Sequence, residues 1–308
     1  MLQLPIPGIV GISTEPYVNA ASVKNEGWEF ALGYNDQWGD WTFGANVNFS
    51  KVKNEILDLH GKDSWITDWS INLEGHPINS YYGYVADGLY RTQEDVDEAN
   101  EKNSVGGGAL KLGDIRYKDI SGPEGKPDGV VDTNDRTVIG NPFPDFTYGF
   151  QTKVSWKSLS LSASFNGVQG RDILNVGNRY NNTPGTKSNN VTRKAFQNMW
   201  TDENPSNLYP KSTFVVQNMV MDRYVEDGSY LRCSDITLSY ILPAKWTNKI
   251  GIKNTSVYAS VKNAFVITDY SGYDPEVNSF AFDGLRPGVD MNSYPTPRSF
   301  VFGLNLTF

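Results

Sequence analysis

The sequence predicts an all-β fold, an antiparallel transmembrane β-barrel with about eight strands and long loops. Two features carry this prediction: segments throughout the chain alternate between apolar and small or polar residues, and the connections between these segments are either very short or very long. A period of two gives a strand two unlike faces, which suits a wall between lipid and water. A single strand of a soluble β-sandwich can show the same alternation. The barrel is therefore favoured by the repetition of the pattern along the chain rather than by any one segment.

The segment 298–308 shows the clearest alternation. One face is apolar and consists of Phe300, Phe302, Leu304, Leu306 and Phe308. The other face is small or polar and consists of Ser299, Val301, Gly303, Asn305 and Thr307. The aromatic Phe308 resembles the ending by which outer-membrane barrel proteins are recognised for insertion.

Earlier segments repeat the pattern, at 28–35, 41–50, 146–156 and 159–166, and more weakly at 236–242 and 257–261, with an aromatic-rich candidate strand at 81–90. Aromatic residues stand at the ends of these strands, namely Trp28, Trp41, Trp156 and Tyr240. An aromatic girdle at a membrane interface would lie there. Ordinary core aromatics are the alternative interpretation.

The connections differ in length. Segments 35–40 and 157–158 predict hairpin turns. By contrast, segments 57–144, 167–228 and 268–297 are long, polar and rich in Gly, Pro, Asn and Asp. Short turns on one side and long extracellular loops on the other are typical of outer-membrane barrels, whereas such loops are unusual in a compact soluble domain unless they carry function.

Composition excludes several classes. In 308 residues, no run of 18 apolar residues occurs, so helical membrane spans are excluded. The net charge of −8 argues against a nucleic-acid partner, which needs a basic surface. A single cysteine, Cys233, excludes an internal disulfide, and we expect a buried or wall-facing thiol. The two histidines, His60 and His76, lack the spacing of a helical metal pair, and we expect them to face solvent.

Enzyme activity is not expected. Glycoside hydrolysis needs one suitably spaced carboxylate pair, and nothing singles out a pair among the 35 acidic residues. The chain has no nucleophile elbow, no phosphate-binding glycine loop after a strand and no metal-binding histidine motif.

An acidic segment holds the one candidate cofactor site, for calcium. Asp128 and Gly129, followed by Val131, Asp132 and Asp135, match the later half of a calcium loop. The early half is interrupted by the proline-containing segment 120–127, and the terminal Glu is replaced by Asp. Two interpretations stay open: an acidic turn capped by Asp and Asn side chains, or weak calcium binding. The calcium ligands would be Asp119, Asp128, Asp132 and Asp135.

Aromatic residues in or near the long loops are candidates for substrate binding, because each ring has an apolar face that stacks on a sugar and a polar edge. They are Tyr81, Tyr82, Tyr84, Tyr180 and Trp200. A soluble β-sandwich carbohydrate-binding module is therefore the alternative function, and packing of the loops against one another is the alternative role of these rings. The helical spacing of Ala195, Phe196, Met199 and Trp200 predicts a short amphipathic helix that buries Trp200.

Several strings carry a family resemblance. They are GDIRYKD at 113–119, DGVVDTNDR at 128–136, IGNPFPDFTYGF at 139–150, VKNEGWE at 23–29, DGSYLR at 227–232, ITLSY at 236–240, KNAF at 262–265, GYDPE at 272–276 and YPTPR at 294–298. In this order, and over nearly the whole chain, they closely resemble the SusC/RagA family of TonB-dependent outer-membrane transporters.

The resemblance implies import through a large barrel with an internal plug in the outer membrane of a Gram-negative bacterium. The cargo would be an oligosaccharide or a peptide, and the partners a SusD-like surface lipoprotein, membrane lipid and the TonB complex, which acts through an N-terminal region absent here. Family members are far longer, so we expect 1–308 to be the C-terminal part of the barrel domain, without signal, plug and earlier strands. Unpaired edges of an open sheet are costly in hydrocarbon, so we expect a fragment unless a partner chain supplies the rest.

Overall fold

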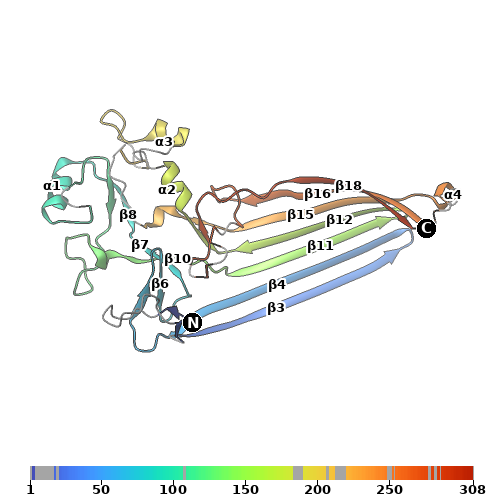
Figure 1. Cartoon of the computed structure of the whole chain (residues 1–308), viewed down its shortest axis with the longest axis horizontal. Helices are drawn as coiled ribbons and strands as arrows, with labels where there is room; N and C mark the ends of the chain where they lie inside the picture. Colours follow the sequence, from blue (N-terminus) through green and yellow to red (C-terminus); the bar gives the residue numbers. More distant parts are fainter. Residues whose placement is uncertain are drawn as a thin grey trace.

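The computed structural model describes residues 2–3, 17–18, 21–106, 109–182, 190–205, 208–211, 220–247, 252, 254–276, 279–280, 283–284 and 286–307. These residues form an elongated molecule with two parts (Figure 1). A long sheet makes up one part, which we call the wall. The other part, which we call the cap, lies at one end of the wall and consists of the described residues of 59–145, 170–229 and 269–298.

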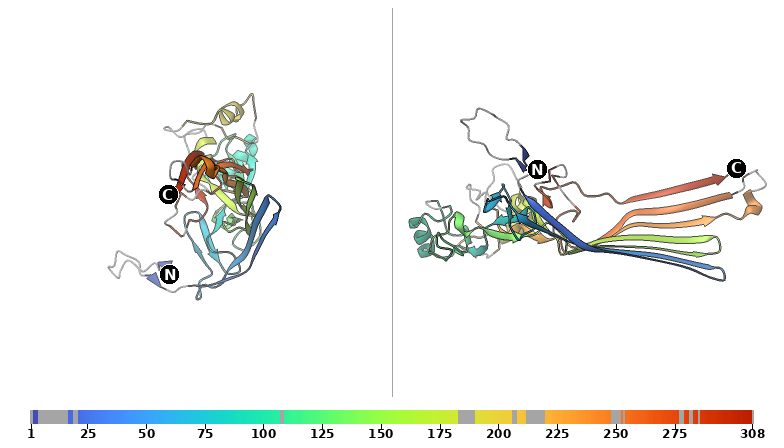
Figure 2. Two further views of the ribbon diagram at one scale, coloured as in Figure 1. Left: turned by 90° about the vertical axis from the view of Figure 1, so that its right-hand side faces the viewer. Right: turned by 90° about the horizontal axis from the view of Figure 1, so that it is seen from below.

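Seven antiparallel strands form the wall, in the order β18-β16-β15-β12-β11-β4-β3. Their bounds are β3 (Ser22–Trp38), β4 (Trp41–Asp58), β11 (Phe146–Trp156), β12 (Leu159–Gln169), β15 (Tyr230–Ile241), β16 (Asn254–Thr268) and β18 (Ser299–Thr307). Each strand pairs with the wall strand that precedes or follows it in the chain, and β3 and β18 are the edges of the described sheet. Seen along the strands, the sheet is a curved band (Figure 2).

The alternating segments are confirmed as wall strands, with two differences. The candidate strand 81–90 is not in the wall, because it divides into the short cap strands β7 (Ser80–Gly83) and β8 (Ala86–Leu89), which belong to different sheets. The first hairpin turn is also shorter than expected, since β3 continues to Trp38 and only Gly39 and Asp40 form the turn. Gly39 has a φ of 59°, the left-handed conformation that tight hairpins need.

The expected difference between the two ends of the sheet is confirmed. At one end, two-residue turns join β3 to β4 and β11 to β12, while the segment 242–253 with α4 (Ala244–Thr247) joins β15 to β16. At the other end, the three long segments that form the cap connect β4 to β11, β12 to β15 and β16 to β18. Figure 1 shows the cap beyond this loop end and the end of β18 among the short turns.

Short elements make up the cap. Its strands form one sheet of β10 (Thr137–Gly140), β7, β6 (Ser70–Leu73) and β5 (Ser64–Ile66), one of β14 (Val225–Asp227), β13 (Asp172–Asn175) and β17 (Val289–Asp290), and one of β8 and β9 (Ile115–Tyr117). Its helices are α1 (Gln93–Glu101), α2 (Val176–Asn182) and α3 (Arg193–Asn198), with the 3-10 turns η2 (Thr133–Asp135) and η3 (Asp222–Tyr224). Near the N-terminus, β1 (Leu2–Gln3) pairs with β2 (Tyr17–Val18).

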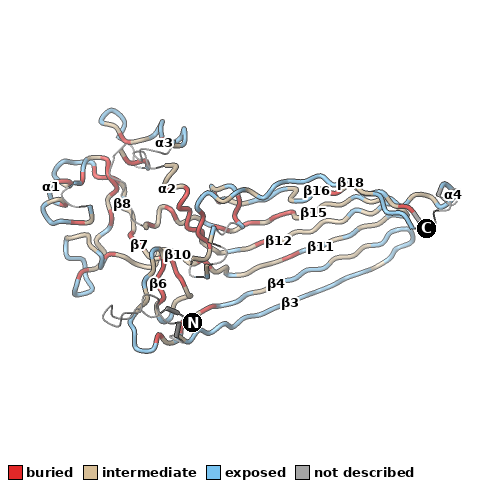
Figure 3. The backbone as a smooth tube through the Cα atoms, in the orientation of Figure 1, coloured by how far each residue is buried: buried red, intermediate tan, exposed pale blue. Residues whose placement is uncertain are grey.

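The hydrophobic core lies in the cap rather than along the wall, as Figure 3 shows. Its buried residues come from all three long segments and are Tyr81, Tyr84, Leu89, Ile115, Tyr117, Leu174, Val176, Trp200, Met221, Tyr224 and Val289. Removing this much apolar surface from water holds the three segments together as one body. Burial also raises the pKa of Tyr81 and Tyr117, so both phenols stay neutral.

The helix expected around Ala195 is confirmed in part. Thr192 caps α3, with its hydroxyl oxygen accepting from the backbone N–H of Ala195 at 3.1 Å, and Ala195 is buried. However, Phe196 is exposed, and Trp200 is buried beyond the end of the helix. Among the described residues, no helix has the length and apolar character needed to cross a membrane.

Candidate functional site

Two unlike faces distinguish the wall. On the apolar face, a row of side chains in register crosses all seven strands near the turn end: Trp38, Trp41, Trp156, Leu159, Tyr240, Val257 and Leu304. Every member is exposed, between 37% and 58%, and the rings of Trp41 and Trp156 lie 6.0 Å apart. An exposed band of aromatic and aliphatic side chains is what a membrane interface favours.

The apolar face has the height of a bilayer core. On β3, Trp28 and Trp38 lie on this face ten residues apart, which corresponds to about 33 Å along a strand and about 25 Å in height at a tilt near 40°. Trp28 is 81% exposed. One acid, Asp36, interrupts the face, and it accepts a hydrogen bond from the hydroxyl of Tyr34 at 2.8 Å.

On the opposite face, polar and small side chains follow one another in register. One row is Gly33, Asn46, Gln151, Ser164, Asp235, Lys262 and Ser299. Lys262 pairs with Asp235 at 2.6 Å, and the hydroxyl of Ser260 donates to the same carboxylate at 2.7 Å. This face is hollowed, with a cavity of about 640 Å³ lined largely by polar side chains of β4, β11 and β12. The polar face therefore suits a water-filled interior.

A buried charge cluster joins the wall to the cap. The guanidinium of Arg232, on β15, lies 2.5 Å from Asp274 and 3.2 Å from Glu276, both in a cap loop. The hydroxyl of Tyr230 also donates to Glu276, at 2.6 Å. Burial alone would raise the pKa of Asp274, but hydrogen bonds from Thr296 and the backbone of Glu276, together with the charge of Arg232, outweigh burial and lower it. The carboxylate thus stays ionised against its partner.

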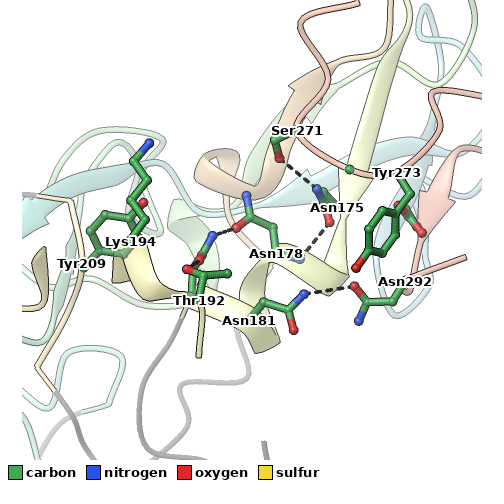
Figure 4. A pocket seen from close by; sticks show the side chains of 12 residues that line it. Asn175, Asn178, Asn181, Thr192, Lys194, Tyr209, Ser271, Tyr273 and Asn292 are labelled. Atoms are coloured by element: carbon green, nitrogen blue, oxygen red, sulfur yellow. Dashed lines mark hydrogen bonds between the residues drawn. The ribbon is translucent and has the colours of Figure 1, made fainter. Parts of the chain in front are cut away.

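The cap contains a pocket of about 420 Å³ that is rich in amides (Figure 4). Its lining comes from β13, α2, α3 with its N-cap, the loop after α3, the loop after β16, β17 and the loop after β17. The lining residues are Asn175, Asn178, Asn181, Asn182, Thr192, Lys194, Tyr209, Ser271, Gly272, Tyr273, Asp290 and Asn292. Asn175 accepts from the backbone N–H of Asn178 at 2.8 Å, and Asn181 donates to Asn292 at 3.1 Å. The first bond lies at the start of α2, and the second joins α2 to the loop that follows β17.

Comparison with known proteins identifies the family. TonB-dependent receptor P26 of Formosa agariphila is 31% identical over all of this chain, which covers 31% of that protein. SusC of Bacteroides thetaiotaomicron, a TonB-dependent receptor, is 28% identical over 99% of the chain and 28% of its own length. The solved structure of the RagAB peptide transporter superposes with a TM-score of 0.78 at 25% identity, over 100% of this chain and 31% of that one. The chain belongs to the SusC/RagA family of TonB-dependent outer-membrane transporters.

The wall is accordingly a portion of the antiparallel barrel fold of this family. The chain spans about a third of the length of the curated relatives it matches. No family model matches the sequence.

The five aromatic residues proposed for substrate binding divide into two groups. Tyr81, Tyr84 and Trp200 pack in the cap core, and none of these three rings offers a free face to a ligand. Tyr82 and Tyr180 are half-buried, with the guanidinium groups of Arg136 and Arg179 over their rings at 5.0 and 5.2 Å. Substrate binding by these aromatic residues stays a prediction. Because the other three rings are buried, the candidates that a ligand could reach are Tyr82 and Tyr180.

The environment of Trp200 explains its burial. Gly113 approaches the indole so closely that a Cβ built there would lie 2.6 Å from Cε3 of Trp200, and Gly113 also has a φ of 84°. Both conditions require glycine at this position. The ammonium of Lys211 also lies over the Trp200 indole, 5.0 Å from the centre of the ring.

The four candidate calcium ligands accept backbone hydrogen bonds. Asp135 is fully buried and accepts from the N–H groups of Ile120, Ser121 and Asp132 at 2.7, 3.0 and 2.7 Å. Asp119 accepts from the backbone of Asp128 and Gly129, Asp128 from that of Val130, and Asp132 from that of Asn134. Within the described ranges, no group of three or more His, Cys, Asp or Glu side chains is arranged to hold a metal ion. This geometry matches the capped acidic turn, and calcium binding stays a prediction.

The remaining expectations concern single residues. Cys233 is fully buried on β15, as expected. His60 is exposed and hydrogen-bonded to Asp58 at 2.7 Å, whereas His76 is half-buried rather than fully solvent-facing.

Two parts of the site were missed by sequence reasoning. The amides at 175, 178, 181 and 182 recur at intervals of three and four, which on a helix places them on one face, and this spacing was a usable signal. The contact of Arg232 with Asp274 had no such signal, because 42 residues separate the two partners.

Proposed function

We propose that this chain forms part of the barrel wall and extracellular cap of an outer-membrane nutrient importer in a Gram-negative bacterium. The single observation that carries this proposal is the wall itself: seven paired strands with an exposed apolar face and a hollowed polar face. A wall of this kind separates lipid from a water-filled path. The relatives named TonB-dependent receptor and peptide transporter support the class of function.

Closure of the barrel requires further strands. The described sheet ends at β3 and β18, whose outer edges pair with no other described strand. Unpaired backbone N–H and C=O groups cost several kcal/mol each in hydrocarbon, in order-of-magnitude terms. Additional strands, from the remainder of the protein or from a partner chain, would therefore pair with both edges.

The cap takes the extracellular role in this proposal. It lies beyond the loop end of the wall, where outer-membrane barrels carry their long extracellular loops. Its amide-rich pocket would receive an oligosaccharide or a peptide, and its outer surface would contact a SusD-like surface lipoprotein. The RagAB structure, in which the chain's structural relative is part of a peptide transporter, supports this assignment.

No covalent chemistry is needed for this function. The polar rows of the wall keep the path hydrated, and the cap positions the substrate above it. The wall strands act as a passive scaffold when the TonB complex supplies energy. The relatives are transporters and receptors rather than enzymes, which agrees with this mechanism.

The alternative function, a soluble carbohydrate-binding sandwich, needs a second sheet to cover the apolar face. In the described residues the row from Trp38 to Leu304 is exposed instead. This observation favours the importer.

Uptake in the native host tests the proposal. We expect the complete gene product to fractionate with the outer membrane, and its deletion to abolish uptake of at least one labelled class of oligosaccharide or peptide. Complementation should restore uptake. Recovery of the protein as a detergent-free soluble monomer, or unchanged uptake of both ligand classes after deletion, would refute it.

A further inference from the structure

Two adjoining hollows in the cap share Asn178, Asn182, Lys194 and Tyr209. The larger is the pocket of about 420 Å³ already described, and the smaller, of about 200 Å³, adds Leu208, Arg223 and Tyr224 to the lining. Because the two hollows share these four lining residues, we treat them as one site, which we call the amide groove. The larger hollow is rich in amides and the smaller one contains two cations, which indicates a ligand that carries both hydroxyl and anionic groups.

The larger hollow has unused hydrogen-bonding capacity. Asn181 donates to Asn292, which leaves Oδ1 of Asn181 and Nδ2 of Asn292 without a hydrogen-bond partner among the described residues. The Asn181 oxygen is an acceptor and the Asn292 nitrogen is a donor. A sugar hydroxyl can both donate and accept a hydrogen bond, so it can pair with either atom. Tyr273, which Figure 4 places beside Asn292, is 72% exposed, so its ring can stack on the apolar face of a pyranose.

The smaller hollow is positively charged. Lys194 and Arg223 both line it, and its described lining contains no carboxylate. Neither cation forms an ion pair with a described residue, although Arg223 is half-buried. A hollow with two cations and no described carboxylate is unusual in a chain whose net charge is −8.

Asp290, the one acid in the described lining of the larger hollow, forms no ion pair with either cation. The carboxylate of Asp290 accepts from the hydroxyl of Tyr270 at 2.6 Å and from the backbone of Ser293 at 2.9 Å. A half-buried guanidinium without a counter-ion is a strong recognition element for a carboxylate or a sulfate group.

We propose that the amide groove binds an acidic oligosaccharide. Asn181 and Asn292 bind its hydroxyls, Tyr273 stacks on a ring, and Lys194 and Arg223 bind its carboxylate or sulfate group. This inference rests on the proposed import function and adds the substrate class. An acidic peptide fits less well, because Leu208 is the only aliphatic side chain in the described lining of both hollows.

Calorimetry on the complete gene product in detergent tests the charge requirement. The probes are a short oligogalacturonate, its carboxyl-reduced neutral counterpart, a sulfated oligosaccharide and an acidic peptide. We expect one or both acidic saccharides to bind at least about tenfold more tightly than the neutral counterpart, because charge-assisted hydrogen bonds are lost on reduction. Equal affinity for the acidic and neutral saccharides, or tighter binding of the peptide, would overturn the proposal.

Variants locate the binding site. Arg223→Gln and Lys194→Gln should each weaken the acidic saccharide about tenfold while leaving the weak affinity for the neutral one unchanged. Asn181→Ala should weaken both saccharides. Arg193→Gln is the matched control, because Arg193 neighbours Lys194 on α3 but does not line the groove, and its affinity should equal that of the wild type. Wild-type affinity in both Gln variants, with the fold verified by circular dichroism, would refute the assignment.

The two levels of inference fail separately. If the purified protein discriminates as expected but the host imports no saccharide or peptide through it, the proposed function fails and the binding site stands. If the host imports a neutral saccharide or a peptide and the purified protein shows no preference for acidic saccharides, the importer stands and the amide groove assignment fails.

Discussion

Arg232 of the wall and Asp274 of the cap form an ion pair of 2.5 Å in which both side chains are 6% exposed. The pair connects two of the strings that carry the family resemblance, DGSYLR and GYDPE. Because Arg232 lies on β15 and Asp274 in the loop after β16, their contact holds that loop against the barrel wall.

Breaking this pair on one side should release the cap. Arg232→Met leaves the buried carboxylate of Asp274 without its ion-pair partner, which costs about 3 to 5 kcal/mol. Asp274→Asn should cost less, because Arg232 keeps its contact with Glu276. Limited proteolysis in outer membranes should then cleave within 272–298. The exposed pair Lys24 and Glu26, 2.6 Å apart, provides the control, and Glu26→Gln should leave the cleavage pattern unchanged. A double variant no less stable than either single variant would confirm that the two residues act on one another, whereas strictly additive losses would contradict it.

The same pair predicts acid sensitivity. Folding lowers the pKa of Asp274, so its contribution to stability is complete above the ordinary value of 3.8 and is lost as the pH falls through the lower value of the folded state. We expect protease susceptibility of 272–298 to rise below about pH 4 in the wild type. Asp274→Asn should be susceptible already at neutral pH and change less on acidification. An identical pH profile for both proteins would rule out this carboxylate as the cause.

Asp135 stabilises the acidic turn of the cap through three backbone hydrogen bonds. Asp135→Ala leaves the backbone N–H groups of three half-buried residues without this acceptor and should lower the free energy of unfolding of the cap by about 3 kcal/mol. Asp128→Ala, at an exposed position with one such bond, should cost less than about 1 kcal/mol. Hydrogen exchange at 119–135 measures both losses, and equal effects of the two variants would refute the distinction.

Calcium binding at this turn is tested separately. Millimolar calcium, compared with EDTA, should raise the melting temperature of the complete gene product if Asp119 and Asp128 bind the ion, and Asp119→Asn should remove the rise. The carboxylates already accept backbone N–H groups, so we expect no shift. A calcium-dependent rise in melting temperature that Asp119→Asn removes would show that the turn binds calcium.

The apolar face of the wall predicts a position-dependent cost of charge. Val47 lies on this face and pairs with Leu32, near the middle of the span between Trp28 and Trp38. Val47→Arg should destabilise the barrel by about 2 to 4 kcal/mol in guanidinium unfolding from lipid. Asn46→Arg, one residue away on the polar face, should cost little. Similar losses for both variants would contradict the two-faced wall.

The wall strands could be predicted from the sequence because their structure depends on local geometry. Alternation at 41–50 and 146–156 predicted β4 and β11, because the period of a strand and the contrast between lipid and water act on each segment by itself. The ends of the strands were harder to predict. For example, β3 continues past Tyr34 to Trp38, because a polar residue such as Asp36 does not by itself end a strand.

The cap could not be predicted in the same way, because distant contacts decide its structure. Tyr81 illustrates this: its hydroxyl donates to the carbonyl of Pro287 at 2.9 Å, across 206 residues. From the sequence, both substrate binding and packing of the loops against one another stayed open for this ring, and the structure shows packing in the cap core. The amide spacing on α2 was a local signal, but the approach of Asn292 to that helix was not.

The most direct test of the central claim measures what each face of the wall contacts. In the complete gene product with Cys233→Ser, a bimane fluorophore is attached at Leu161→Cys or at its neighbour Ser162→Cys on β12, and the protein is reconstituted in a bilayer that contains spin-labelled lipid. We predict that spin-labelled lipid quenches the probe at position 161 and that aqueous iodide quenches the probe at position 162. A probe at position 161 that neither quencher reaches would mean a packed soluble core and would contradict the account.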